Sequence, residues 1–367
     1  VQAQAVRLQA SLALERGQLD LAEQLAGEAA GLAAADEPRL EAVIASHRHG
    51  PEAALAALGE PTSAAGRKLR ISLWLQLERF DDADRELAEL AEDSETLRLR
   101  TLRHLLAGDA STALGFAVRA LALDDQRTIV RRVAAIAHYA SALSPRVGAA
   151  YMCHPHPIGR NFVRGDARSA AALERAAELF SLSAERDPDP LGTEHDRVWR
   201  LACLSNLEGR IGDAEALCAS ILDTSPTNVF AIGWAMSRNL QFDRDRSLAA
   251  LRVALADGSL PESAVRALEW LWPDDHVEAL KAALNEALTR TPPLPGDVAG
   301  EVRAGLQRLD GAGDAAEGAR YFAIVERARE SGNWDEAVAL FEEMAAGETF
   351  EPGFVYLAED LASAERW

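Results

Sequence analysis

Hydrophobic residues recur every three to four positions along most of the chain, with polar residues between them. Segments 128–143, 197–207 and 215–222 follow this spacing. A period near 3.6 residues is that of an amphipathic α-helix, and the period-2 alternation typical of strands is missing. Alanine and leucine supply most of the apolar residues and favour closely packed helices. We therefore expect an all-α chain.

A helical hairpin is clearest between residues 197 and 226. Gly209 permits a tight turn between its two helices, and Ala214 permits a close approach of two backbones. Pro226 ends the second helix because proline cannot continue it. The segment therefore has the plan helix, turn, helix, and other parts of the chain repeat it.

The residues of this hairpin resemble the tetratricopeptide repeat (TPR), a helix pair of 34 residues, as found in bacterial proteins. The matching positions are Gly209, Ile211, Ala214, Cys218, Ile221 and Pro226. A unit near the C-terminus matches at Gly332, Trp334, Ala337, Phe341 and Met344. Weaker units place the alanine at Ala22, Ala83, Ala113 and Ala176, with Glu78 where glycine is expected.

The resemblance implies a right-handed α-solenoid of about eight antiparallel TPR-like helix pairs. One hairpin cannot bury its apolar face alone, so neighbouring pairs stack. We expect TPR-like repeats over 1–143, an irregular insertion over 144–168, further repeats over 169–351 and a capping helix over 352–367.

The insertion is where the repeat spacing fails. Ala176 comes about 29 residues later than a 34-residue period after Ala113 predicts. Prolines 155 and 157 forbid regular helix there. The segment is either a packed structural excursion or a contact loop. The candidate contacts are Tyr151, His154, His156, Arg160 and Asn161. A weak metal alternative uses Cys153, His154 and His156, which have donor atoms suited to zinc.

In the TPR family the first helix of each pair lines a concave groove that holds peptides or partner proteins. The groove candidates implied by this resemblance are Arg132, Tyr139, Trp199, Asn206 and Phe230. The alternative for Tyr139 and Trp199 is that both side chains only pack in the core.

Charge and cysteine content narrow the functional classes. The net charge of −20 argues against a nucleic-acid binder, which needs a basic face, and we expect the arginines between 98 and 132 to pair with nearby acids. No apolar stretch is long enough for a membrane span. The three cysteines cannot all pair, which suits a cytoplasmic protein. We expect Cys203 and Cys218 to be core residues.

Nothing in the sequence marks the chain as an enzyme or points to a cofactor. It has no P-loop, no H-E-x-x-H, no calcium loop and no G-x-S-x-G elbow. We therefore expect a scaffold that binds a peptide or partner protein. The start at Val1 keeps a second function open, an accessory or substrate-recruiting region of a larger enzyme. A third is a metal- or small-ligand-binding protein that uses the insertion.

Overall fold

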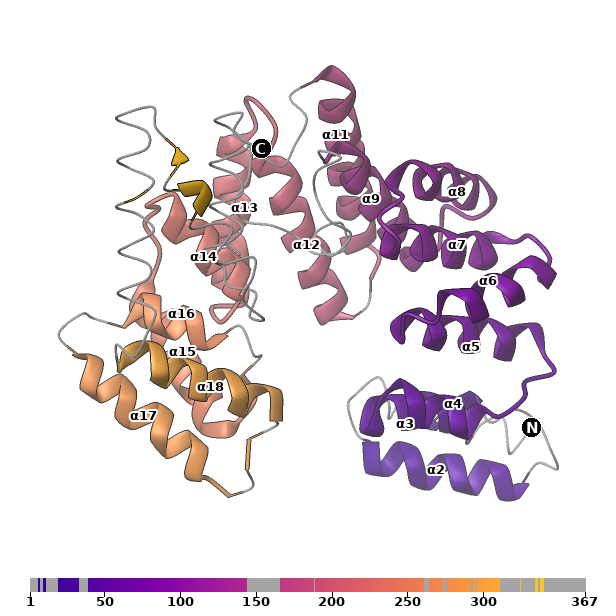
Figure 1. The fold of residues 1–367 in the computed structure, drawn as a ribbon, viewed down its shortest axis with the longest axis horizontal. Coiled ribbons are helices and arrows are strands. Elements are labelled where there is room, and N and C mark those ends of the chain that lie inside the picture. Colours follow the sequence, from indigo (N-terminus) through magenta and orange to yellow (C-terminus); the bar gives the residue numbers. More distant parts are fainter. Residues whose placement is uncertain are drawn as a thin grey trace. The chain divides into compact units, whose positions relative to one another are not determined.

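The computed structural model describes residues 19–32, 39–143, 166–187, 189–260, 264–272, 276–291 and 296–310, with a few further positions. Most of the described residues lie in α-helices (Figure 1). By their backbone hydrogen bonds, none of the described residues lies in a β-strand. This confirms the all-α prediction. None of the described helices is both long and apolar enough to cross a membrane.

The chain divides into two compact units, Val1–Ala214 and Glu215–Trp367. The helices of the first unit are α2 (Leu19–Leu32), α3 (Arg39–His49), α4 (Pro51–Leu58), α5 (Ala64–Gln76), α6 (Phe80–Glu89), α7 (Ser94–Leu106), α8 (Ala110–Leu123), α9 (Thr128–Ala142), α11 (Ala167–Ala184) and α12 (Pro190–Ser205). Helix α13 (Ile211–Thr224) spans the division. The second unit continues with α14 (Val229–Ser237), α15 (Arg244–Asp257), α16 (Ala264–Leu271), α17 (Val277–Thr289) and α18 (Gly296–Leu309).

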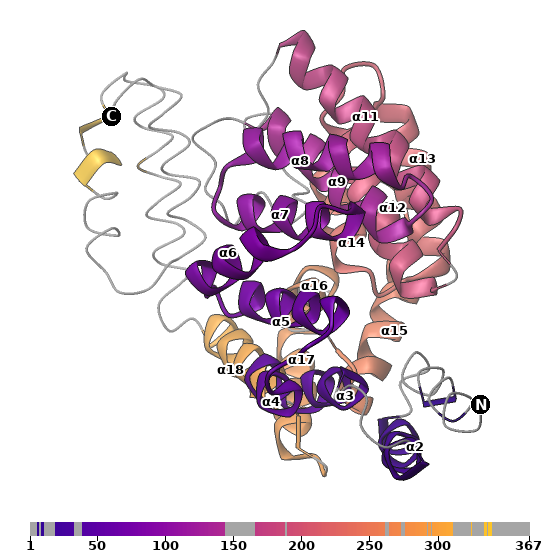
Figure 2. The same cartoon turned by 90° about the vertical axis from the view of Figure 1, so that its right-hand side faces the viewer.

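Consecutive helices of the first unit pack in pairs. Helix α3 packs against α4, α5 against α6, α7 against α8, and α9 against α11. The first helices of successive pairs also touch, α5 with α7 and α7 with α9. Figures 1 and 2 both show α7, α8 and α9 as neighbours. The first unit is therefore built from stacked helix pairs.

Several turns between consecutive helices place a residue in the same left-handed backbone conformation. The left-handed region is occupied by Glu78 (φ 56°), Gly108 (φ 77°), Gly209 (φ 75°) and Asn239 (φ 53°). At three of the turns an N–H group closes the helix end on the carbonyl five residues earlier: Arg79 on Trp74 (2.8 Å), Asp109 on His104 (2.8 Å) and Leu240 on Ala235 (2.9 Å). This is the Schellman helix end, which favours glycine at the left-handed position. The sequence predicted the turns at Gly209 and at Glu78, where glutamate stands for glycine, but it did not predict the one at Asn239.

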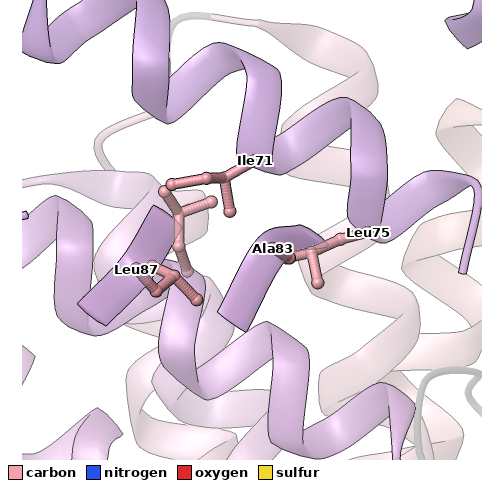
Figure 3. Close-up of a cluster of buried hydrophobic side chains, with 5 residues drawn as sticks. Ile71, Leu75, Ala83 and Leu87 are labelled. Atoms are coloured by element: carbon pink, nitrogen blue, oxygen red, sulfur yellow. The ribbon is translucent and has the colours of Figure 1, made fainter. Parts of the chain in front are cut away.

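Small residues allow the helices of each pair to approach. The alanines predicted to lie at close helix contacts are all fully buried: Ala22, Ala83, Ala113, Ala176, Ala214 and Ala337. Figure 3 shows one such contact, where Ile71 and Leu75 of α5 meet Ala83 and Leu87 of α6. Leu99 of α7 completes this cluster. These alanines are therefore buried, as their predicted place at close helix contacts requires.

Aspartates determine where several helices begin. Asp189 accepts hydrogen bonds from the Leu191 and Gly192 N–H groups (3.1 and 3.2 Å), and Pro190 occupies the first turn. Because of this cap, α12 begins seven residues before the position that hydrophobic spacing predicted. Asp166 caps α11 in the same way through the Ser169 N–H (2.7 Å), so the helix begins at Ala167, inside the predicted 144–168 insertion.

The second unit holds its own buried contacts. Helix α15 packs against α16 and α17, and α18 packs against α16 and α17. The guanidinium of Arg252 lies 3.9 Å from the ring centroid of Trp272, a cation–π contact. Gly233 lets the Trp270 ring approach, because a Cβ there would lie 3.1 Å from Trp270 Cζ3.

Candidate functional site

Two of the predicted groove residues form part of an aromatic core. Tyr139 of α9 and Trp199 of α12 are each 1% exposed. Their rings meet edge to face with centroids 5.2 Å apart, and Phe180 of α11 stacks on the Trp199 ring at 5.6 Å. The sequence left two alternatives for these side chains, a groove surface or packing in the core, and the structure buries them between three helices. Their burial gives them a packing role, since a ligand cannot reach them.

Arg132, the third groove candidate, joins α9 to the start of α12. Its Nε donates to Asp196 Oδ1 (2.7 Å), and its Nη2 bonds Asp187 Oδ2 (2.5 Å). Nη2 also donates to the Gly192 carbonyl (3.2 Å). A Cβ at Gly192 would lie 2.2 Å from Asp187 Oδ2, so a side chain there would displace the Asp187 carboxylate. The Arg132 guanidinium is thus engaged by hydrogen bonds to groups of the protein itself.

The buried Asp196 carboxylate is held in its charged form. Burial alone would raise its pKa, but hydrogen bonds from His195 and Arg132 outweigh burial and hold the pKa below its usual range. His195 Nε2 also accepts a hydrogen bond from Trp199 Nε1 (3.1 Å). The ion pair and the aromatic stack therefore form one continuous seam between α9, α11 and α12.

The remaining predicted residues do not join this seam. Asn206 ends α12 and donates through Nδ2 to the Ala202 carbonyl (2.8 Å), while its buried Oδ1 has no hydrogen-bond partner among the described residues. Phe230 is half-buried in α14 of the second unit. Tyr151, Cys153, His154, His156, Arg160 and Asn161 lie outside the described residues, as does the predicted capping helix 352–367. Within the described part of the chain, no cluster of histidine, cysteine and acidic residues could hold a metal.

Both described cysteines are core residues, as predicted. Cys203 and Cys218 are buried and unpaired. Burial raises the pKa of Cys203 strongly and that of Cys218 to about 11. Neither thiol is therefore a nucleophile at neutral pH.

A charged pocket that the sequence did not predict lies on the first helices α5 and α7 and on Arg127, which precedes α9. Its volume is about 500 Å³. Lys68 pairs with Asp93, and Arg98 bonds Glu95 (2.6 Å). Arg127 Nη1 lies 3.2 Å from Glu95 Oε2. Ion pairs thus line a surface shared by three successive first-helix segments.

The acids of this pocket also serve the fold. Asp93 caps α7 by accepting the Thr96 N–H (2.8 Å). Burial would raise the pKa of Glu95, but the hydrogen bond from Arg98 and the charges of Arg98, Arg127 and Lys68 lower it. Asp93 and Glu95 look like ordinary residues of a helix start in the sequence. Only the fold brings Lys68 and Arg127 beside them.

The chain matches no protein-family model and no curated protein. Function is therefore argued from the geometry of the described residues.

Proposed function

We propose that this chain is a protein-interaction scaffold of the TPR type, which binds an extended segment of a partner protein across the first helices α5, α7 and α9. The observation that carries the proposal is the charged pocket shared by α5, α7 and the residue before α9. In the TPR family the first helix of each pair lines the ligand groove, and α5, α7 and α9 are the first helices of their pairs here.

The cations of the pocket retain hydrogen-bonding capacity for a ligand. Lys68 has three N–H donors and bonds only Asp93 among the described residues. Arg98 donates hydrogen bonds from Nε and Nη2 to Glu95, so its Nη1 can donate to a ligand. Arg127, with half of its side chain exposed, is engaged only by Glu95 in the described part of the chain. An extended peptide offers carbonyl oxygens and acidic side chains to such donors.

Helix contacts make this surface continuous. Because α5 touches α7 and α7 touches α9, a segment that crosses the pocket can contact all three helices without leaving the surface. The half-buried Leu69 supplies an apolar contact beside Lys68 and Ser72. This mixture favours a partner segment with acidic and aliphatic side chains.

Neutralising two pocket cations tests the proposal. The full chain is used to capture a partner from native cell extract, the bound segment is mapped, and its Kd is measured against Lys68→Gln/Arg127→Gln. We expect binding at least about tenfold weaker, since charge-assisted hydrogen bonds are lost. Arg85→Gln is the matched control, because Arg85 is a strongly exposed arginine on the second helix α6. Unchanged affinity in the double variant would contradict the proposal.

A further inference from the structure

Arg131 differs from the other arginines of its region. Arg98, Arg103 and Arg132 each bond a carboxylate. Arg131 is only 4% exposed, yet no carboxylate pairs with it among the described residues. Its one hydrogen bond there is a long contact of 3.4 Å from Nη1 to the Leu182 carbonyl. Buried arginines are normally paired, because an isolated charge loses its hydration without compensation.

The guanidinium lines a pocket bordered by α8, α9 and α11, whose volume is about 450 Å³. Helix α9 packs against both of the other helices. The apolar walls come from α8 and α11, with Leu121, Leu179 and Leu182 among the lining residues. The exposed Val118 also lines the pocket, so solvent has access to it. This volume lies within the range of small-molecule sites.

Three other titratable groups line the pocket. His138 lies on α9, and burial followed by the charge of Arg175 lowers its pKa to about 4. The imidazole is therefore neutral at pH 7. Arg175 Nη1 bonds Glu178 (2.5 Å), whereas the exposed Asp125 is the only acid among the lining residues of the described structure. Within the described part of the chain, Arg131 is thus a buried cation that no carboxylate pairs with.

We propose that this pocket binds a small carboxylate with an aliphatic chain, whose carboxylate pairs with Arg131 and whose chain packs against the leucines of α8 and α11. A guanidinium and a carboxylate match in geometry and can form two parallel hydrogen bonds. The leucine walls favour an alkyl chain over a bare inorganic anion. The site is separate from the first-helix pocket, so this proposal does not depend on the proposed scaffold function.

Octanoate is the probe, with octanol and inorganic phosphate as comparisons, and binding is followed by calorimetry and by NMR of the His138 imidazole. Octanoate should bind saturably and at least about tenfold more tightly than octanol, which has no charge for Arg131. The bound anion should raise the pKa of His138, because a nearby negative charge favours the imidazolium. Phosphate that binds as tightly as octanoate would overturn the aliphatic part of the proposal.

Arg131→Met separates a binding residue from a structural one. If the cation serves a ligand, the variant loses octanoate affinity at least about tenfold while its Tm stays level or rises, because an unpaired buried charge has been removed. Arg85→Met, on the exposed face of α6, should bind octanoate normally.

Val118→Asp is the second variant, since this exposed position tolerates a polar side chain. Its carboxylate should repel the ligand and weaken octanoate binding. Normal octanoate affinity in both Arg131→Met and Val118→Asp, or no octanoate binding by the native chain, would overturn the proposal.

Discussion

At the scale of the residue, Glu78 holds a backbone conformation that suits glycine better. It ends α5 with a φ of 56°, in the same Schellman turn that Gly108 forms after α7. A side chain with a Cβ is strained there, whereas glycine is not. The turn is set by the helix pair around it, since the sequence places an unfavourable residue at its centre.

We therefore predict that Glu78→Gly stabilises the chain by about 0.5–1 kcal/mol, less the entropy that glycine adds to the unfolded state. The reverse change, Gly209→Ala, should destabilise by a similar amount. No atom lies within 4 Å of an added Cβ at Gly209, so backbone strain alone is tested there. Urea unfolding measures both variants, and a loss of stability in Glu78→Gly would contradict the assignment.

Sequence reasoning succeeded where a residue's size decides its place. The alanines at close helix contacts were predicted and are fully buried, because only a small side chain fits between two helices. For Tyr139 and Trp199 the same reasoning could not decide between a groove surface and core packing. Periodicity shows which face of a helix a residue occupies, but it does not show whether another helix or solvent covers that face.

At the scale of the element, one ion pair ties α9 to α12. Arg132 and Asp196 are 64 positions apart, and no local sequence pattern predicts their contact. Asp187, which precedes α12, and Gly192, in the first turn of α12, complete the arrangement. Long-range pairs of this kind depend on how helices stack, so the sequence could suggest Arg132 as a site residue but not its partners.

We predict that Asp196→Asn lowers stability at pH 7 by about 1–3 kcal/mol, because the half-buried Arg132 guanidinium loses one of its two charged partners and keeps only Asp187. Asp196 has a folded-state pKa below its unfolded value of about 3.9. Its contribution is therefore complete above that value and is lost as the pH falls through the folded pKa.

Urea unfolding between pH 2 and pH 7 measures this effect. The native chain should lose more stability on acidification than Asp196→Asn does. Asp223→Asn, at an exposed aspartate of α13, should follow the native curve. Parallel curves for the native chain and Asp196→Asn would show that the ion pair does not stabilise the fold.

At the scale of the molecule, the helix pairs of the first unit explain why the chain offers a long surface. Helix α5 contacts α7 and α7 contacts α9, so residues far apart in sequence, such as Lys68 and Arg127, line one pocket. The sequence predicted paired helices from their turns and alanines. It could not predict the pocket, because its charges converge only through stacking.

Hydrogen–deuterium exchange of the full chain, with and without its captured partner segment, tests the central claim most directly. If the partner lies across the first helices, amide protection should increase in α5, α7 and the first turn of α9. Helices α6 and α8, the second members of these pairs, should change little. Protection confined to α6 and α8, with α5 and α7 unchanged, would contradict the account.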